Sequence, residues 1–409
     1  MSLLQNPPDL SNITHPNWIE INLDALQNNV RYIRSLIPKS TKILLPVKAD
    51  SYGHGSLACS YAAKAFGVDF LGVAHLTEGI LLRQYGINLD ILVLGACIEE
   101  DFPYLTEFKL TASISDKETA IKFDRYLEKT GCSCKAHIKI DSGMNRYGIK
   151  ANQLEDILEI TELKHLQIEG MFTHLATADI DMPGHSNTEK QISLFFSVID
   201  FLTSKNKRPA ICHCANSPGV LLHPSCHLDM VRPGLALYGY NPMGATPPTC
   251  PIKPIMSIKA TVRTIHEVPA GDGVSYGQYY VADNPIKVAT IAIGYGDGYL
   301  RGEYNSGCVF IRNHLCPILG RVCMDATMVD VSSVPDLQIG ETVDVINGDV
   351  NFKISMEMVA EEHHTIPYEI TSRVARRLYR RYLWKNQLIR WDDLREELRI
   401  KEFKEYPFR

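Results

Sequence analysis

A lysine stands at the end of a strongly apolar run, where a charged side chain is unusual. Residues 43–55 read ILLPVKADSYGHG, so that Lys48 follows the run and precedes Tyr52 and two glycines around His54. A buried ammonium group is costly unless it is paired. Burial lowers the pKa of a lysine, and its neutral amine can then act as a nucleophile or form a Schiff base. A surface lysine just past a strand end is the alternative, and other parts of the chain must decide between the two.

Further polar side chains occur where other predicted strands end. They are Lys139, Asp141, Arg146, His174, Asn216, Ser217 and Arg232, the last followed by Gly234 and Tyr238. Each has an ordinary structural explanation by itself, such as a buried histidine, a loop charge or a helix cap. If the strands are parallel strands of one barrel, however, their carboxyl ends meet at one rim, which is where such barrels carry their chemistry. The groups at that rim could bind an anionic, aromatic ligand.

The last two strands of such a barrel commonly supply a phosphate site from the loops that follow them. We expect Ser217 to cap the turn into residues 218–222, so that its hydroxyl and nearby backbone amides could hold a phosphate. Lys48 for a Schiff base, this phosphate site and Arg232 together suggest pyridoxal 5′-phosphate as the cofactor.

The elements that position these residues follow a regular alternation. Apolar, β-rich runs occur at residues 43–47, 70–74, 91–94, 110–114, 136–140, 168–173, 210–214 and 230–238. Helical periodicity occurs at residues 23–37, 57–66, 77–85, 117–129, 153–161 and 188–204. The pattern predicts an α/β fold, an N-terminal (β/α)8 (TIM) barrel. A doubly wound sheet is the alternative, but no Gly-x-Gly-x-x-Gly follows the first strand.

The alternation of apolar and helical segments stops at a stretch that holds five prolines, from Pro242 to Pro254. We therefore expect a barrel over residues 12–250 and a C-terminal, mainly β domain over residues 251–383, with residues 1–11 packed on the β domain. Helical segments are expected at 356–363 and 372–382. The charged, amphipathic tail, 384–409, is expected to form a surface helix.

Composition excludes several classes of function. The net charge is -5 without a long basic run, so we expect neither nucleic acid nor an anionic membrane as a main partner. The 11 cysteines are scattered and include no Cys-x-x-Cys pair, so we expect no metal site and a reducing, cytoplasmic location. Neither a signal peptide nor an apolar run long enough to cross a bilayer is found in the sequence.

Eight short motifs, in order, resemble those of alanine racemases, which are pyridoxal-phosphate enzymes of fold type III. The motifs are VKADSYGHG (47–55), KIDSGMNR (139–146), THLATAD (173–179), VRPG (231–234), VSYG (274–277), IGYGDG (293–298), GRVCMD (320–325) and TIPY (365–368). One such match would be weak, whereas eight in register across both predicted domains are specific. The resemblance implies racemisation of alanine, with D-alanine supplied for peptidoglycan.

The resemblance also implies roles for single residues. Lys48 would bind the cofactor covalently and act as one base, and Tyr276 of the partner subunit in a homodimer would act as the other. The cofactor would be held by Tyr52, His174, Asn216, Ser217, Arg232, Gly234 and Tyr368. Arg146 and Met324 would bind the substrate, Lys139 would be open to carbamylation, and Asp179, Tyr295, Arg301 and Arg321 would line the entrance.

Two other functions within the same cofactor chemistry stay open at this point. A pyridoxal-phosphate amino-acid decarboxylase of the same two-domain plan would share the lysine, but it would lack a tyrosine base such as Tyr276. A non-enzymatic carrier of the cofactor would consist of the barrel alone. Three positions depart from the family pattern: Asn145, Pro233 and the run Cys212-His-Cys214.

Overall fold

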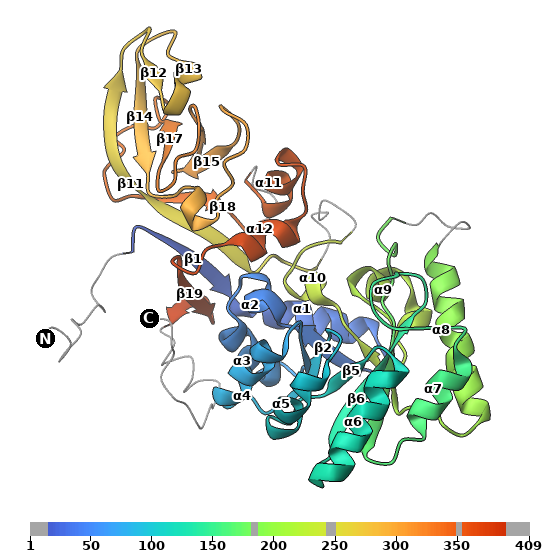
Figure 1. Cartoon of the computed structure of the whole chain (residues 1–409). Coiled ribbons are helices and arrows are strands. Elements are labelled where there is room, and N and C mark those ends of the chain that lie inside the picture. Colours follow the sequence, from blue (N-terminus) through green and yellow to red (C-terminus); the bar gives the residue numbers. More distant parts are fainter. Residues whose placement is uncertain (1–14, 181–186, 243–250, 349–353, 390–409) are drawn as a thin grey trace, which may run out of the picture. The chain divides into compact units, whose positions relative to one another are not determined.

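The computed structural model describes residues 15–180, 187–242, 251–348 and 354–389, and the chain forms two compact units (Figure 1). One unit contains residues 22–255 and the chain from residue 382 onward, and the other combines residues 256–381 with the segment that ends at Ile21. Residues 1–11 and most of the tail, 390–409, lie outside the described residues, as do residues 243–250 of the proline-rich stretch.

The first unit is the predicted barrel. Its strands are β2 (Lys42–Pro46), β3 (Phe70–Val73), β4 (Asp90–Val93), β5 (Ala112–Ile114), β6 (Cys134–Asp141), β8 (Leu166–Phe172), β9 (Ile211–His213) and β10 (Met230–Val231). They run parallel in two arcs, β10-β2-β3-β4 and β5-β6-β8-β9. A parallel bridge between Leu92 and Thr111 joins the first pair of arc ends. The N–H of Arg232 donates to the carbonyl of Ala215 at 2.9 Å between the other pair, so the predicted (β/α)8 fold is confirmed.

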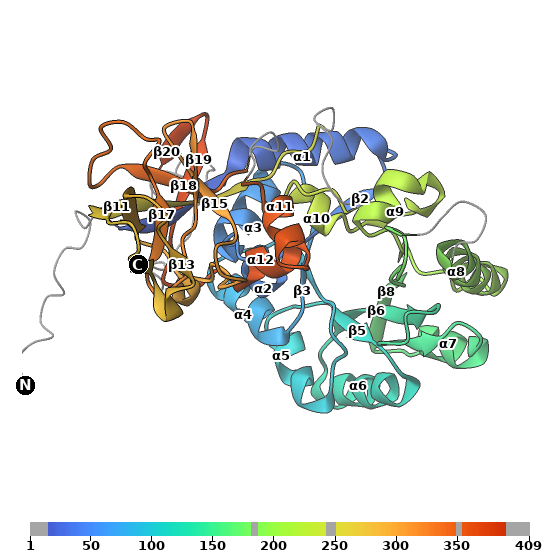
Figure 2. The ribbon, with the colours of Figure 1, turned by 90° about the horizontal axis from the view of Figure 1, so that it is seen from above.

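The helices of this unit cover the outside of the strands, as Figure 2 shows for α6, α7 and α8 around β5, β6 and β8. They are α1 (Leu23–Leu36), α3 (Ser56–Ala65), α4 (Leu76–Gln84), α5 (Phe102–Glu107), α6 (Lys117–Thr130), α7 (Leu154–Thr161) and α8 (Asn187–Ser204), with the short α2 (Lys48–Tyr52), α9 (Ser217–Leu222) and α10 (Gly234–Leu237) near the strand ends. The strand β7 (Ile149–Lys150) pairs with β6.

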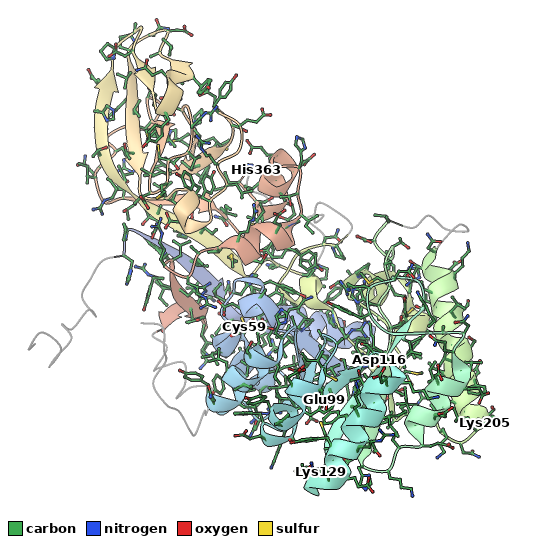
Figure 3. The ribbon with its side chains drawn as sticks, in the orientation of Figure 1. Cys59, Glu99, Asp116, Lys129, Lys205 and His363 are labelled. Atoms are coloured by element: carbon green, nitrogen blue, oxygen red, sulfur yellow. The ribbon has the colours of Figure 1, made fainter. Side chains whose placement is uncertain are left out.

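Helix α6 illustrates why these segments are helical. The side chain of Asp116 accepts from the N–H of Thr119 at 2.8 Å and caps the first turn, while Lys129 lies in the last turn (Figure 3). Both charges complement the helix dipole. The face that turns inward carries the buried residues Ala120, Phe123 and Leu127 at helical spacing.

The barrel interior holds one layer of large apolar side chains. Its members are Leu44, Phe70, Leu92, Phe172, Ile211 and Met230, contributed by six different strands. These residues fill the barrel, so that polar side chains on the same strands are held above or below a packed layer.

The second unit is a β domain. Its main sheet runs β16 (His314–Pro317), β15 (Cys308–Ile311), β18 (Thr342–Ile346), β11 (Met256–Val268), β1 (Asn17–Asn22) and β19 (Tyr379–Trp384), whose last three residues are counted with the first unit. Off this path, β14 (Ile286–Ile291) pairs with β11, and β17 (Thr327–Asp330) pairs with β14. The pair β12 (Gly273–Val274) and β13 (Tyr280–Val281) and the helices α11 (Met356–Glu362) and α12 (Pro367–Arg373) complete it. Residues 17–21, which the sequence analysis assigned to the barrel, belong here because β1 pairs with β11, Ile19 lying opposite Ile258.

The helix expected at residues 372–382 is wrong. Helix α12 ends at Arg373, and residues 379–384 form β19, which pairs with β20 (Gln387–Ile389). Lys385 and Asn386 connect them with φ angles of 51° and 57°, the two positive angles of a tight hairpin turn. The structure thus starts the tail expected at 384–409 with a strand and a turn rather than a helix.

Two further findings limit the classes of function. None of the described helices is both long and apolar enough to cross a membrane. Within the described ranges, no group of three or more histidine, cysteine, aspartate or glutamate side chains is arranged to hold a metal ion.

Candidate active site

The residue that ends the first barrel strand is followed by a left-handed turn. Four consecutive residues after Lys48, namely Ala49, Asp50, Ser51 and Tyr52, have φ angles between 50° and 56°. Such a conformation costs about 1–2 kcal/mol for each residue that has a Cβ atom. A run of this kind persists only where surrounding contacts impose it, and it commonly marks a functional site.

Glu78 is one of the residues that impose this turn. One oxygen of its carboxylate accepts from the N–H of Ala49 at 2.7 Å, and the other accepts from the N–H groups of Ala74 and His75 at 2.7 and 3.1 Å. The same side chain therefore starts helix α4 and holds the backbone next to Lys48. Glu78 is not among the predicted site residues, although its position three residues after His75 is that of a helix-capping glutamate.

Cationic side chains gather at the carboxyl ends of the strands. Burial, and then the charge of Arg146, lower the pKa of Lys48, against an opposing effect of Glu78. Lys139 is 6% exposed, and burial followed by the charges of Arg232 and Arg146 lowers its pKa well below the usual value. Because each of these charges affects the pKa of a neighbour, the four predicted residues form one cluster: Lys48, Lys139, Arg146 and Arg232. The cluster attracts anions and favours a neutral, reactive amine.

Arg232 is buried just past β10. One NH1 proton points at Nδ1 of His213, 2.7 Å away, and NH2 donates to the carbonyls of Thr173 and Cys214 at 2.7 and 3.2 Å. Guanidinium has five N–H donors, so two of them donate to none of the described residues. Those two are available to an acceptor such as a ring nitrogen.

The loops after β9 and β10 meet the left-handed turn. The hydroxyl of Ser217 accepts from the N–H of Ala236 at 3.1 Å. A Cβ atom at Gly234 would lie 3.1 Å from the hydroxyl of Tyr52 and 3.3 Å from Pro46, so the backbone there is close to the phenol because Gly234 has no side chain. The hydroxyl groups of Ser217 and Tyr52 and the backbone at Gly234 thus line one small region. This set of donors suits a phosphate.

The helix cap in this region differs from the expectation. Asn216, with extended dihedral angles, caps α9, and its side-chain oxygen accepts from the N–H of Gly219 at 3.1 Å. Ser217 is already the first helical residue, so the prediction that it is the cap is wrong. Its hydroxyl is directed instead to Ala236 in α10.

The unusual proline after Arg232 has a local explanation. Pro233 has φ −79° and ψ 61°, and the N–H of Gly234 donates to the carbonyl of Arg232 at 2.9 Å. This is an inverse γ-turn, whose φ is close to the angle that the proline ring imposes. Pro233 therefore reverses the chain between β10 and α10 without strain.

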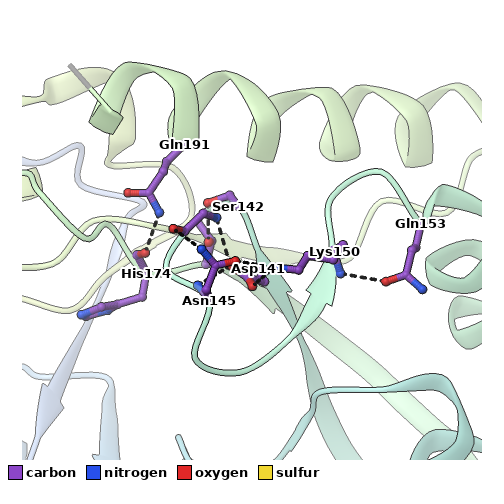
Figure 4. Close-up of polar contacts among 9 residues, drawn as sticks. Asp141, Ser142, Asn145, Lys150, Gln153, His174 and Gln191 are labelled. Atoms are coloured by element: carbon purple, nitrogen blue, oxygen red, sulfur yellow. Dashed lines mark hydrogen bonds and ion pairs between the residues drawn. The ribbon is translucent and has the colours of Figure 1, made fainter. Parts of the chain in front are cut away.

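The loop that carries Arg146 is shaped by Asp141 at the end of β6 (Figure 4). One carboxylate oxygen of Asp141 accepts from the N–H groups of Gly143 and Asn145 at 2.9 and 3.0 Å, and the other pairs with Lys150 at 2.7 Å. Asn145 has a φ of 56°. Asparagine tolerates this left-handed angle better than most residues, which explains how it replaces the glycine that is frequent there.

His174 is held through its backbone. Its carbonyl accepts from the side-chain nitrogen of Gln191 on α8 at 3.1 Å, and the other end of that amide accepts from the N–H of Ala176 at 2.8 Å (Figure 4). Burial, and then the charge of Arg232, lower the pKa of His174 well below its usual value, so its imidazole is neutral. No motif in the sequence points to Gln191.

The other predicted residues lie in the β domain, apart from Asp179, which is exposed in the barrel unit. Tyr276 follows β12 and is 69% exposed, and Met324 is 53% exposed. Three loops there are tied together: the hydroxyl of Ser275 donates to the carbonyl of Arg321 at 2.6 Å, and the N–H of Gly296 donates to the carbonyl of Met324 at 2.8 Å. Tyr276 and Met324 are thus exposed side chains on loops that hydrogen bonds hold together.

The entrance residues of this domain lie on two of these loops. Tyr295 and Arg301 line one pocket with Arg373. The guanidinium of Arg321 lies 4.4 Å from the ring centroid of Tyr279. Tyr368 is half-buried at the start of α12.

Comparisons with known proteins match almost the whole chain. The family model for the N-terminal domain of alanine racemase matches residues 21–242, and the model for the C-terminal domain matches residues 255–382. The alanine racemase of Halothermothrix orenii is 36% identical over 92% of this chain and 98% of its own length. That of Methanococcus maripaludis is 37% identical over 91% of this chain and 100% of its own length.

Solved structures agree. An alanine racemase from Clostridium difficile 630 has a TM-score of 0.85 and 35% identity, covering 92% of this chain and 98% of its own. The alanine racemase of Bacillus anthracis, solved with bound L-Ala-P, has a TM-score of 0.84 and 32% identity, covering 92% and 97% of the two chains.

Proposed function

The chain belongs to the alanine racemase family, isomerases that interconvert L- and D-alanine, and from this we propose which cofactor and residues perform the reaction. The observation that carries the proposal is the cluster of Lys48, Lys139, Arg146 and Arg232 at one end of the barrel. In that cluster, burial and neighbouring cations lower the pKa of both lysines.

The cofactor is pyridoxal 5′-phosphate. When bound, its aldehyde bonds to a primary amine and its ring system delocalises the charge left on Cα when a proton is removed. The residues fit this group: Tyr52, Ser217 and the backbone at Gly234 would hold the phosphate, with Asn216 capping the helix beside them and Tyr368 as a further contact. His174, neutral and held by Gln191, would pack beside the ring.

Arg232 would face the ring nitrogen with the donors that no described residue uses. Guanidinium only donates hydrogen bonds, so it keeps that nitrogen unprotonated. An unprotonated ring withdraws electrons less strongly, and this disfavours side reactions such as transamination.

Lys48 is both the covalent attachment point and one of two bases. Inversion at Cα needs a proton removed from one face and another delivered to the opposite face. The amine of Lys48 serves one face. Its lowered pKa brings it closer to neutral pH, which suits a group that must both accept and donate a proton.

Tyr276 is the second base, supplied by the partner subunit of a homodimer. Its high exposure on a support braced through Ser275 is what a residue needs to reach the site of another chain. Met324 would accompany it and bind the substrate, and Tyr295, Arg301 and Arg321, with Asp179, would line the approach. The carboxylate of alanine would be bound by Arg146.

We further propose a reducing compartment, the cytoplasm. The cysteines within the described ranges are free thiols, several of them deeply buried. Burial raises the pKa of Cys97 and Cys134 to about 12, so these thiols are unreactive packing residues.

Enantiomer analysis tests the proposal. Purified protein with pyridoxal 5′-phosphate is incubated with a panel of L-amino acids, and both enantiomers and carbon dioxide are measured. D-Alanine without carbon dioxide supports racemisation, whereas carbon dioxide indicates a decarboxylase and bound cofactor without either product indicates a carrier.

Three variants then test the assigned residues. Lys48→Ala is expected to lose the covalently bound, coloured cofactor. Tyr276→Phe should keep the cofactor and lower turnover of L-alanine by about 10²–10⁴-fold, the usual contribution of a proton-transfer group. Tyr279→Phe, a tyrosine that stacks on Tyr304 nearby, is the matched control and should stay near the parent. Equal rates for the two tyrosine variants would show that Tyr276 is not the base.

A further inference from the structure

Among the described residues, no carboxylate is a direct partner of the buried guanidinium of Arg232. It is 5% exposed, and its acceptors are two carbonyls and the ring of His213. A buried cation without a counter-charge is costly, and it is normally compensated by a network of hydrogen bonds. The ring of His213 is where such a network begins.

Two fully buried histidines continue the network. Nε2 of His213 lies 2.8 Å from Nδ1 of His137, and both side chains have 0% exposure. Burial is the largest influence on the pKa of each imidazole and lowers it, so both rings are neutral. A neutral imidazole carries one N–H and one acceptor nitrogen, and its tautomer follows from its partners.

Arg232 sets the direction of every bond in this network. Guanidinium has no acceptor, so Nδ1 of His213 must accept and Nε2 of His213 must carry the proton. That proton is donated to Nδ1 of His137, which leaves the proton of His137 on Nε2. Each ring therefore directs its N–H away from Arg232.

Glu169 lies where the network needs an acceptor. Its Oε2 is 3.7 Å from Nε2 of His137, and neither of these buried atoms has a closer hydrogen-bond partner in the described part of the chain. Its Oε1 pairs with Lys135 at 2.8 Å. The contact with His137, and then Lys135, lower the pKa of Glu169 to about 2 against the effect of burial, so it is an anion.

The backbone is adapted to this arrangement at two adjacent residues. The register between β6 and β8 shifts so that Ala136 faces Ile168 and His137 faces Gly170, which leaves Glu169 as the extra residue of a β-bulge. Bulges redirect side chains. A Cβ atom at Gly170 would lie 2.5 Å from the ring of His137, so the ring occupies space that only a glycine leaves free.

We propose that Arg232, His213, His137 and Glu169 form a one-directional hydrogen-bond chain, and that Glu169 and His137 are positioning residues for Arg232. A donor-only group stands at one end and an acceptor-only group at the other, so one arrangement of protons satisfies all four side chains. The chain holds the plane of the guanidinium and links its charge to a carboxylate. Only the role of Arg232 beside the cofactor rests on the proposed function.

Histidine tautomers are the direct test. The full-length protein, saturated with pyridoxal 5′-phosphate and labelled with ¹⁵N-histidine, is studied by long-range ¹H–¹⁵N correlation between pH 6.5 and 8. Substitution of each histidine in turn assigns its signals.

Both His137 and His213 are expected to be neutral with the proton on Nε2. A proton on Nδ1 of either ring, or a doubly protonated ring, overturns the proposal. A protein without racemase activity but with these tautomers would refute the proposed function alone.

Paired variants separate positioning from packing. In His137→Gln, the amide can still accept from His213 and donate to Glu169, whereas His137→Phe keeps a ring but neither group. The kcat for alanine of the Gln variant is expected to be at least ten times that of the Phe variant at full cofactor occupancy. Glu169→Gln should lower kcat more than Glu267→Gln, an exposed strand glutamate in the β domain. Equal kcat values within each pair would contradict a positioning role.

Discussion

The amine nitrogen of Lys139 lies 4.1 Å from the centroid of the Phe172 ring, on the inside of the barrel. The face of an aromatic ring attracts a cation, but it replaces a carboxylate only weakly. Arg232, Arg146 and Lys48 all act against a positive charge on Lys139, and Asp141 alone among the named influences favours it. The amine is therefore held in a form that reacts with carbon dioxide.

Carbamylation of Lys139 follows from this relationship. The neutral amine adds to the carbon of carbon dioxide and releases a proton, and the resulting anion can pair with Arg146. In protein incubated with ¹³C-bicarbonate we expect one carbamate carbon signal by NMR. The signal should be absent from Lys139→Met. It should be present in Lys205→Met, which changes an exposed lysine directly after helix α8 (Figure 3). Density for a plain amine at Lys139 in a high-resolution crystal structure would refute this prediction.

Stability is expected to fall as the pH drops below about 6.5. The pKa values of His137 and His213 are lowered in the folded protein from 6.5, so below that value the unfolded chain binds protons that the folded chain does not. The free energy of unfolding therefore decreases with falling pH, by up to about 1.4 kcal/mol per pH unit for each histidine. Urea unfolding between pH 5 and 8 measures this.

The control for that effect is His137→Gln. It removes one of the buried histidines whose pKa is lowered, a set that also includes His174, so the slope below pH 6.5 should be shallower than in the parent. An unchanged slope would mean that other groups cause the loss of stability.

Gly234→Ala should weaken cofactor binding. The added Cβ atom would lie 3.1 Å from the hydroxyl of Tyr52, which must then shift away from the proposed phosphate site. Loss of a hydrogen bond to a charged group corresponds to roughly a 10-fold or greater increase in Kd. Titration of the apoprotein with pyridoxal 5′-phosphate measures the change. Gly79→Ala, whose Cβ would lie 2.9 Å from the side chain of Leu110 and has only apolar side-chain atoms as its nearest neighbours, tests a similar steric strain away from the proposed phosphate site, and it should have the smaller effect.

Asn145 should be replaceable by glycine but not by alanine. Its φ of 56° suits glycine, whereas alanine in this region costs about 1–2 kcal/mol. Asn145→Ala is expected to destabilise the loop before Arg146 and to raise KM for alanine more than kcat falls. Steady-state kinetics and urea unfolding of the Ala and Gly variants provide the comparison. A KM for Asn145→Gly as high as that of the Ala variant would show that the side-chain contacts of Asn145 matter more than its backbone angle.

Local patterns in the sequence were sufficient for most of the barrel. Apolar runs with helical segments between them predicted its strands to within a few residues, because alternation of buried strands and amphipathic helices depends on short-range periodicity. The last run, 230–238, was the exception. Only Met230–Val231 are a strand, since the γ-turn at Pro233 sends the chain into α10.

Hairpins and helices were harder to distinguish near the end of the chain. Residues 379–384 have enough alternation to form β19, but their charged side chains also suit a surface helix. Tertiary contacts decided the outcome: Tyr382 is buried and the ring of Trp384 stacks on Phe66 at 5.2 Å between centroids.

By itself the sequence determined the fold class, the family and the side chains able to do the chemistry, because these depend on residue types and on spacing within short motifs. Tertiary structure alone decided how those side chains are supported. The left-handed turn after Lys48 is imposed by Glu78, which comes from a different βα unit. The chain from Arg232 to Glu169 joins residues far apart in sequence and depends on a bulge in β8, which no local pattern encodes.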